Sequence, residues 1–259
     1  MVLNHKGVDI HYEDHGNGEV IILLHGFLED QSMWNDIVPH LSVSNRIITL
    51  DLLGHGKTGC LGYIHTMEDM ADSVLAVLKH LKIDSTIIIG HSMGGYAALA
   101  IAEQHPELIK GLCLMNSTFE ADTQERKDIR TRAIAMAKHS FENLIRMSFA
   151  NLFAPESRKK FKSEYESALA VALQTSVQGY IAAQEGMKIR TNRFEVLKSL
   201  KAKKIIILGK KDSIIDGKHL LKKIENTDIF YEEFSEGHMS HIENNKNLLS
   251  FLKHFIENL

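Results

Sequence analysis

Residues 86–98 join an apolar, β-branched run to a glycine-rich turn and an alanine-rich stretch. The run Thr-Ile-Ile-Ile predicts a buried strand, and the residues from Met93 onward predict a helix that starts directly behind the turn. Such a sharp turn leaves no room for side chains two positions before and after its centre, where Gly90 and Gly94 stand. The turn would therefore present Ser92 Oγ above the carboxyl edge of a sheet, facing the N–H groups of the helix N-terminus.

Strand and helix patterns alternate along most of the chain. The predicted strands are Val8–Glu13, Val20–Leu24, Arg46–Leu50, Thr86–Ile89, Leu112–Met115, Lys204–Leu208 and Asp228–Phe234. The predicted amphipathic helices are Ser32–Leu41, Met67–Leu81, Met93–Gln104 and Asn245–Glu257. Because strands separated by helix-length segments form βαβ units, this order predicts an α/β fold with a mostly parallel, doubly wound sheet covered on both faces.

Length and charge limit the partners that this chain would bind. A chain of 259 residues is long enough for one large α/β domain that buries its core without disulfides. The 30 basic and 33 acidic residues give a formal net charge of −3, which provides no strong field for nucleic acid or an anionic membrane. The N-terminal residues lack the apolar core of a signal peptide, and no apolar run approaches the length of a membrane span. We expect a cytoplasmic protein with a small-molecule substrate; its oligomeric state is not indicated.

The sequence shows no motif for a cofactor or a metal ion. It contains neither a G-x-G-x-x-G nor a P-loop pattern, which would indicate a nucleotide. The two cysteines, Cys60 and Cys113, do not form a C-x-x-C motif or share a ligand spacing with histidines. We therefore expect chemistry that needs neither a cofactor nor a metal.

The pentapeptide Gly-His-Ser-Met-Gly around Ser92 resembles the nucleophile elbow of the α/β-hydrolase superfamily. The tripeptide His25-Gly26-Phe27 directly follows the apolar run Val20–Leu24 and resembles a second motif of that superfamily. The resemblance implies an α/β-hydrolase fold with Ser92 as the nucleophile. It also implies that the backbone N–H groups of Phe27 and Met93 form the oxyanion hole, which stabilises negative charge without any particular side chain.

In the superfamily, an acid and then a histidine follow the nucleophile along the chain. Asp212 lies in the turn after the predicted strand Lys204–Leu208, and His238 lies in the turn after the last predicted strand. The resemblance therefore implies that His238 is the general base and that Asp212 orients it. Position in the sequence leaves other candidates open: His241 for the base, and Asp216, Glu120 or Asp122 for the acid.

Between Ser117 and Arg193 the strand pattern stops and one helical pattern follows another. By resemblance, residues 117–193 are a helical cap inserted after the sixth strand, on a core made of residues 1–116 and 194–259. We expect apolar cap residues to roof a small hydrophobic pocket, with the cap arginines facing water. Arginines that faced inward would instead favour an acidic substrate. The arginines in question are Arg126, Arg130, Arg132 and Arg146.

A serine nucleophile implies an acyl-enzyme formed from an ester, a thioester, an amide or an activated C–C bond. The sequence therefore predicts a cofactor-independent serine hydrolase of small carboxylic esters, with Ser92, His238 and Asp212 as its triad. The same residues would also serve a C–C bond hydrolase, a perhydrolase or a menaquinone-pathway-like lyase on an acidic substrate. A slow-turnover ligand receptor on the same fold is a further alternative, which steady-state turnover of a short-chain ester would distinguish from an enzyme.

Overall fold

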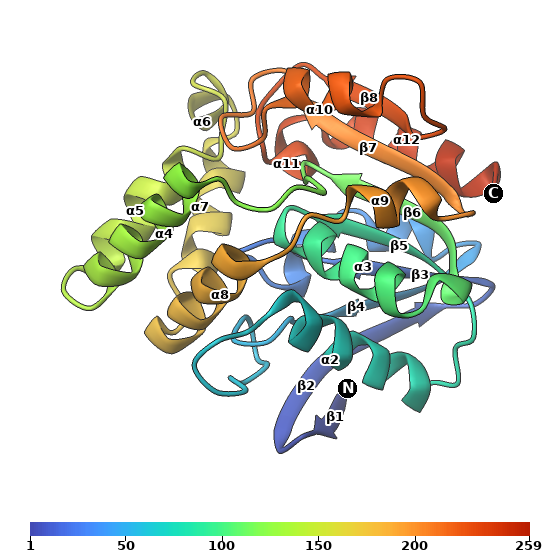
Figure 1. Cartoon of the computed structure of the whole chain (residues 1–259), viewed down its shortest axis with the longest axis horizontal. Coiled ribbons are helices and arrows are strands. Elements are labelled where there is room, and N and C mark those ends of the chain that lie inside the picture. Colours follow the sequence, from blue (N-terminus) through green and yellow to red (C-terminus); the bar gives the residue numbers. More distant parts are fainter.

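Eight strands form one sheet in the computed structural model, which describes residues 1–259 (Figure 1). They are β1 (Val2–His5), β2 (Val8–Gly16), β3 (Glu19–Leu24), β4 (Asn45–Leu50), β5 (Thr86–His91), β6 (Ile109–Met115), β7 (Lys203–Gly209) and β8 (Phe230–Phe234). Their spatial order is β1-β2-β4-β3-β5-β6-β7-β8, and only the two pairs that include β2 are antiparallel. The chain passes from β3 to β4 on one side and returns to β5 on the other, so a topological switch point separates β3 and β5.

Helices cover both faces of the sheet. Consecutive strand residues point to opposite sides, so a strand that is apolar throughout has an apolar surface to bury on each face. Ile22 and Leu24 of β3 belong to an apolar cluster on one face, whereas Ile21 and Leu23 pack with Trp34 on the other. The first face carries α2 (Met67–His80), α3 (Met93–Gln104), α9 (Phe194–Ser199) and α10 (Gly217–Ile224). The second face carries the 3-10 turn η1 (Gln31–Trp34), α1 (Val38–Leu41) and α12 (Asn245–Glu257). The predicted two-sided coverage of the sheet is therefore confirmed.

Six helices follow one another between β6 and β7, and the five before α9 gather at one end of the molecule (Figure 1). These five are α4 (Gln124–Ala137), α5 (Phe141–Ala150), α6 (Ser157–Lys160), α7 (Lys162–Ala172) and α8 (Val177–Ile189). Phe149 and Tyr180 are buried in an apolar cluster of their own, which also includes Leu28 and Met239. The inserted helices thus pack onto the loops that follow β3 and β8.

The structure corrects several predicted elements. All seven predicted strands are present, but β1 was not predicted, because its four residues alternate only between exposed and half-buried positions. The predicted helix Ser32–Leu41 is wrong as one element: η1 and α1 replace it, and Pro39, which has no N–H, stands at the start of α1. Four short segments were also missed: the 3-10 turn η2 (Pro106–Leu108), α9, α10 and α11 (Ser240–Glu243). None of the helices has the length and apolar character that a membrane crossing requires.

Candidate active site

Ser92 occupies the sharp turn between β5 and α3, with φ 49° and ψ −112°. A residue with a Cβ rarely adopts this conformation, so the surrounding structure must hold it in place. Its N–H donates to the Met115 carbonyl over 2.9 Å, and its own carbonyl accepts the Ser117 hydroxyl over 2.7 Å. A Cβ at Gly90 would collide with the backbone of Gly94, which explains the need for glycine at this close approach.

The turn brings Ser92 into hydrogen-bond distance of two side chains from distant loops. Ser92 Oγ lies 2.9 Å from His238 Nε2, and His238 Nδ1 lies 2.8 Å from Asp212 Oδ2. The other carboxylate oxygen of Asp212 accepts the N–H groups of Ile214 and Ile215. Burial alone would raise the pKa of Asp212, but His238 and these N–H groups outweigh it and lower that pKa. The carboxylate therefore stays ionised and can hold a charged imidazole.

Asn116 also contacts the acid, and the sequence analysis missed it. It follows β6 with φ 45°, and its side-chain amide donates to Asp212 Oδ2 and to the Gly237 carbonyl, each over 3.2 Å. The amide thereby ties the loop that carries Asp212 to the loop that carries His238. Its position directly after the predicted strand Leu112–Met115 was the one available signal.

The competing candidates for base and acid lie elsewhere. His241 Nε2 faces a buried glutamate at 3.7 Å and makes no hydrogen bond to Ser92. Asp216 caps the N-terminus of α10, while Glu120 pairs with a histidine near the surface. Asp122 is buried among arginines. The structure therefore brings together only the predicted set of serine, histidine and aspartate.

Behind the turn, Glu29 and His91 form a buried ion pair that no sequence motif indicated. Glu29 Oε2 accepts His91 Nδ1 over 2.7 Å and the Gly26 N–H over 2.6 Å. His91 Nε2 lies 3.0 Å from the His238 carbonyl, so both ring nitrogens donate and the ring is charged. Burial opposes this charge, but Glu29 outweighs it and raises the pKa of His91. Burial likewise opposes ionisation of Glu29, yet His91 lowers the pKa of Glu29 to about 2.

Phe27 and Met93 lie at the two strand ends that flank the topological switch point. Phe27 follows β3 and lines the cavity above Ser92, and its N–H donates to no protein acceptor. Met93 is the first residue of α3, so its N–H has no intrahelical acceptor. His25 fixes the first loop, since its Nε2 accepts the Leu52 N–H over 2.9 Å. Both predicted oxyanion donors thus carry an unpaired N–H, Phe27 in the wall of the cavity and Met93 next to Ser92 in the chain.

A cavity of 480 Å³ opens above Ser92 and His238, and Asp212 lies behind His238. Its apolar wall combines Phe27, Leu28 and Met239 from the sheet side with residues of α4, α5 and α8, among them Leu144 and Tyr180. The volume is that of a small-molecule pocket. The inserted helices thus supply much of the wall opposite Ser92.

The cap arginines are not all in the positions expected from the sequence. Arg146 is exposed and pairs with Glu142, as expected. Arg126, Arg130 and Arg132 instead line the cavity. The expectation that these arginines face water is therefore wrong for Arg126 and Arg130, which are only partly exposed, and Arg132 lies at the cavity's exposed edge.

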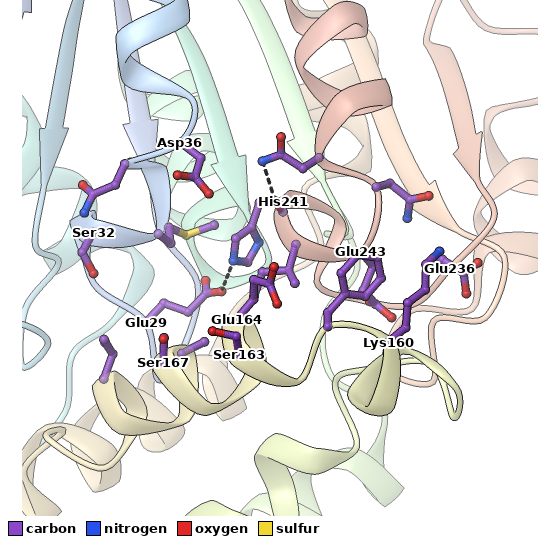
Figure 2. A pocket seen from close by; sticks show the side chains of 18 of the residues that line it. Glu29, Ser32, Asp36, Lys160, Ser163, Glu164, Ser167, Glu236, His241 and Glu243 are labelled. Carbon is purple, nitrogen blue, oxygen red and sulfur yellow. Dashed lines mark hydrogen bonds and ion pairs between the residues drawn. The ribbon is translucent and has the colours of Figure 1, made fainter.

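Glu29 also lines a second cavity, of 930 Å³, shown in Figure 2. There it faces His241 across 3.7 Å, and burial lowers the pKa of His241 to about 4. Ligand atoms of Glu29, His91 and His241 lie within 4.8 Å of one another, a spacing that a metal ion could use. His91 already uses both ring nitrogens, so a metal would have to displace Glu29 or the His238 carbonyl.

Known proteins resemble this chain over most of its length. It is 28% identical to the dihydrolipoyllysine-residue acetyltransferase component of the acetoin cleaving system of Pseudomonas putida, over 91% of this chain and 64% of that protein. It is 23% identical to 3-oxoadipate enol-lactonase 1 of Acinetobacter baylyi, over 100% of this chain and 97% of that protein. An esterase structure from Thermogutta terrifontis superposes with a TM-score of 0.90 at 24% identity, over 99% of this chain and 96% of the other.

The chain spans less than two thirds of the length of the first of these relatives. The likeness to the esterase structure concerns the fold, in agreement with the sheet order found here. The family model described as alpha/beta hydrolase fold matches residues 19–245, which include the turn at Ser92 and the loops that carry Asp212 and His238. On this match, the chain belongs to the alpha/beta hydrolase family.

Proposed function

We propose that this protein is a cofactor-independent serine hydrolase that cleaves small carboxylic esters through an acyl-enzyme. The observation that carries the proposal is the hydrogen-bonded chain from Ser92 through His238 to Asp212, with links of 2.9 and 2.8 Å, at the floor of a cavity that has a partly apolar wall. A serine hydroxyl becomes nucleophilic when an adjacent imidazole accepts its proton and a carboxylate holds that imidazole in place.

In the first half of the reaction, Ser92 Oγ attacks the ester carbonyl carbon while His238 Nε2 accepts the hydroxyl proton. The carbonyl oxygen becomes an oxyanion, which the N–H groups of Phe27 and Met93 stabilise. The bond to the leaving oxygen then breaks, and His238 returns the proton so that an alcohol departs. The acyl group stays on Ser92.

In the second half, water attacks the acyl carbon and gives its proton to His238. The bond to Ser92 Oγ breaks, the serine recovers its proton, and the carboxylic acid leaves. One ester and one water thus become one acid and one alcohol. Asp212 stays ionised throughout and stabilises the imidazolium that forms twice per cycle.

We also propose that residues 117–193 act as a cap that encloses the substrate. Two observations support this role: α4, α5 and α8 line the cavity, and the apolar cluster of the inserted helices includes Leu28 and Met239 from the sheet side. Closing the cavity removes water and strengthens the electrostatic interactions inside it.

The proposal is tested with a fluorophosphonate probe and 4-nitrophenyl butyrate. Wild-type protein is expected to turn over many equivalents of ester and to carry the probe on Ser92 by peptide mass spectrometry. Ser92→Ala should lose the label and about a thousandfold or more in kcat. Ser148→Ala is the control, because Ser148 lines the same cavity but bonds to backbone carbonyls. Undiminished labelling of Ser92→Ala would refute the mechanism, and a single slow wild-type cycle would favour a receptor.

A further inference from the structure

Helix α4 gives the catalytic cavity a positively charged wall. Arg126 and Arg130 are one helical turn apart and share a face, and Arg132 lies at the cavity's edge. Glu29 is the one carboxylate among the lining residues, and His91 already neutralises it. No carboxylate in the cavity wall is therefore left to balance the arginines.

Behind this wall, the single carboxylate of Asp122 does not balance the charge of the arginines around it. Asp122 is fully buried and lies 3.6 Å from Arg126 Nε, 2.5 Å from Arg130 Nε and 2.6 Å from Arg190 Nη1. One negative charge thus faces three guanidinium groups, which cannot lose their protons at any ordinary pH. The other carboxylate nearby, Glu120, pairs with a histidine. The cluster retains two positive charges in excess, which a bound anion would balance.

Two of the three guanidinium groups are fully engaged in holding the fold. Arg190 is 3% exposed, stacks on the Tyr96 ring and donates to backbone carbonyls as well as to Asp122. Arg130 is 11% exposed and donates to Gln184 and to Asp122. Both arginines hold the buried carboxylate of Asp122, and their charge acts on the cavity, from its wall for Arg130 and from behind that wall for Arg190.

Arg126 is different, because most of its donors are unused. Its Nη1 donates to the Ile214 carbonyl over 2.9 Å, on the loop that carries Asp212. Its Nε is beyond hydrogen-bond distance of Asp122, and its Nη2 has no acceptor. Arg132 makes neither an ion pair nor a hydrogen bond. The free N–H groups of Arg126 can meet a planar, doubly accepting anion, for which a guanidinium is suited, and the exposed Arg132 adds an unpaired charge at the cavity's edge.

We propose that Arg126 and Arg132 form a carboxylate subsite in the catalytic cavity, so that the preferred substrate is a small ester bearing a free carboxylate, such as a monoester of a dicarboxylic acid. The inference rests on the proposed function and narrows its substrate class. Arg126 binds the carboxylate directly, Arg132 attracts it at the entrance, and the excess charge around Asp122 stabilises it from behind. The apolar cavity wall takes the intervening carbon chain.

The test compares 4-nitrophenyl monoesters of glutarate and adipate with 4-nitrophenyl pentanoate and hexanoate. Wild-type protein should show at least about tenfold higher kcat/KM for the acidic member of each pair at low ionic strength, and added salt should erode that preference. Arg126→Gln should reduce the ratio of acidic to neutral kcat/KM about tenfold, and Arg132→Gln by a few-fold with a weaker salt dependence. Arg146→Gln, outside the cavity, is the control and should leave the ratio unchanged.

The outcomes separate the two proposals. If the neutral esters are hydrolysed through Ser92 but are equal or better substrates, the carboxylate subsite is refuted and the ester hydrolase stands. If no ester of either kind is hydrolysed and Ser92 is not labelled, the proposed function itself fails. Arg132 makes no hydrogen bond or ion pair, so its substitution breaks none. A preference that survives both arginine substitutions would also overturn the subsite.

Discussion

Glu29 Oε2 and His91 Nδ1 lie 2.7 Å apart in the interior, directly behind Ser92, the proposed nucleophile. His91 precedes Ser92 in the chain and also holds the His238 carbonyl, while Glu29 holds the Gly26 N–H. One buried charge pair therefore connects the loop of the proposed oxyanion donor Phe27, the turn at Ser92 and the loop of the proposed base. These three segments come from distant parts of the sequence.

Glu29→Gln is expected to lower both turnover and stability. An amide leaves the buried His91 without its counter-charge, which costs about 3 kcal/mol of unfolding free energy. Loosening of the three loops should lower kcat by about tenfold to a hundredfold while KM changes little. Urea unfolding and steady-state kinetics measure the two effects, with the exposed Glu142→Gln as control. Lower stability with an unchanged kcat would restrict the pair to a structural role.

His238→Ala should abolish ester turnover, whereas His241→Ala should keep most of it. Only His238 lies within hydrogen-bond distance of Ser92, while His241 faces Glu29. The expected loss for His238→Ala is about a thousandfold or more in kcat. The measurement is kcat for 4-nitrophenyl butyrate in both variants, after circular dichroism has shown that each is folded. The reverse order of effects would assign the base to His241.

Stability should fall as the pH drops from about 6.5 toward 4. Burial lowers the pKa of His241 to about 4 and that of His55 to about 3, so the folded protein keeps both neutral while the unfolded chain takes up their protons. His241 alone would cost roughly 3 kcal/mol over that range. The pKa of Glu29 is lowered to about 2. Its ionised carboxylate therefore contributes fully to stability until the pH falls below the pKa of an ordinary glutamate.

Urea unfolding at about pH 7 and about pH 5 provides the measurement for this pH dependence. A His241→Gln variant removes one of the two titrating imidazoles, so it should lose less stability between the two pH values than the wild type. Substitution of His105, an exposed residue, is the control. Parallel losses in wild type and His241→Gln would exclude His241 as a source of the acid sensitivity.

Asp122→Asn should destabilise the inserted helices. Removal of the carboxylate leaves the largely buried Arg130 and Arg190 without an anion, a change that costs about 3 to 5 kcal/mol. Asp128→Asn is the matched control, since Asp128 is exposed and its one side-chain partner is Gln124. Thermal unfolding of both variants checks the prediction. An equal, small loss for the two would mean that the arginine cluster does not need its shared carboxylate.

The strands of the sheet interior could be predicted because they are almost purely apolar. Ile21–Leu24 and Ile87–Ile89 are buried on both faces and show this in their composition. β1 could not be predicted in the same way, because an edge strand of four residues carries no such run. The long α2 was found within one residue from its amphipathic pattern, and the structure shows that a capping box at Thr66 begins it.

The residues of the candidate site likewise differ in how far the sequence could predict their positions. Ser92, Asp212 and His238 follow strands, so their approach at one sheet edge could be inferred from chain order. Glu29 could not, because it lies in the loop after β3 while His91 ends β5, and only packing brings them together. The orientation of the arginines on α4 was equally hidden. It depends on the shared carboxylate of Asp122, whose remaining partner, Arg190, directly follows α8.

Ser92 keeps backbone angles that glycine adopts freely and serine does not. A strained residue of this kind costs the native state roughly 1–3 kcal/mol. Thermal resistance and turnover therefore compete at a single position: Ser92→Gly should raise Tm by roughly 2–4 °C and eliminate ester cleavage. Selection for thermal stability alone would therefore favour replacement of Ser92 by glycine, with loss of its hydroxyl group.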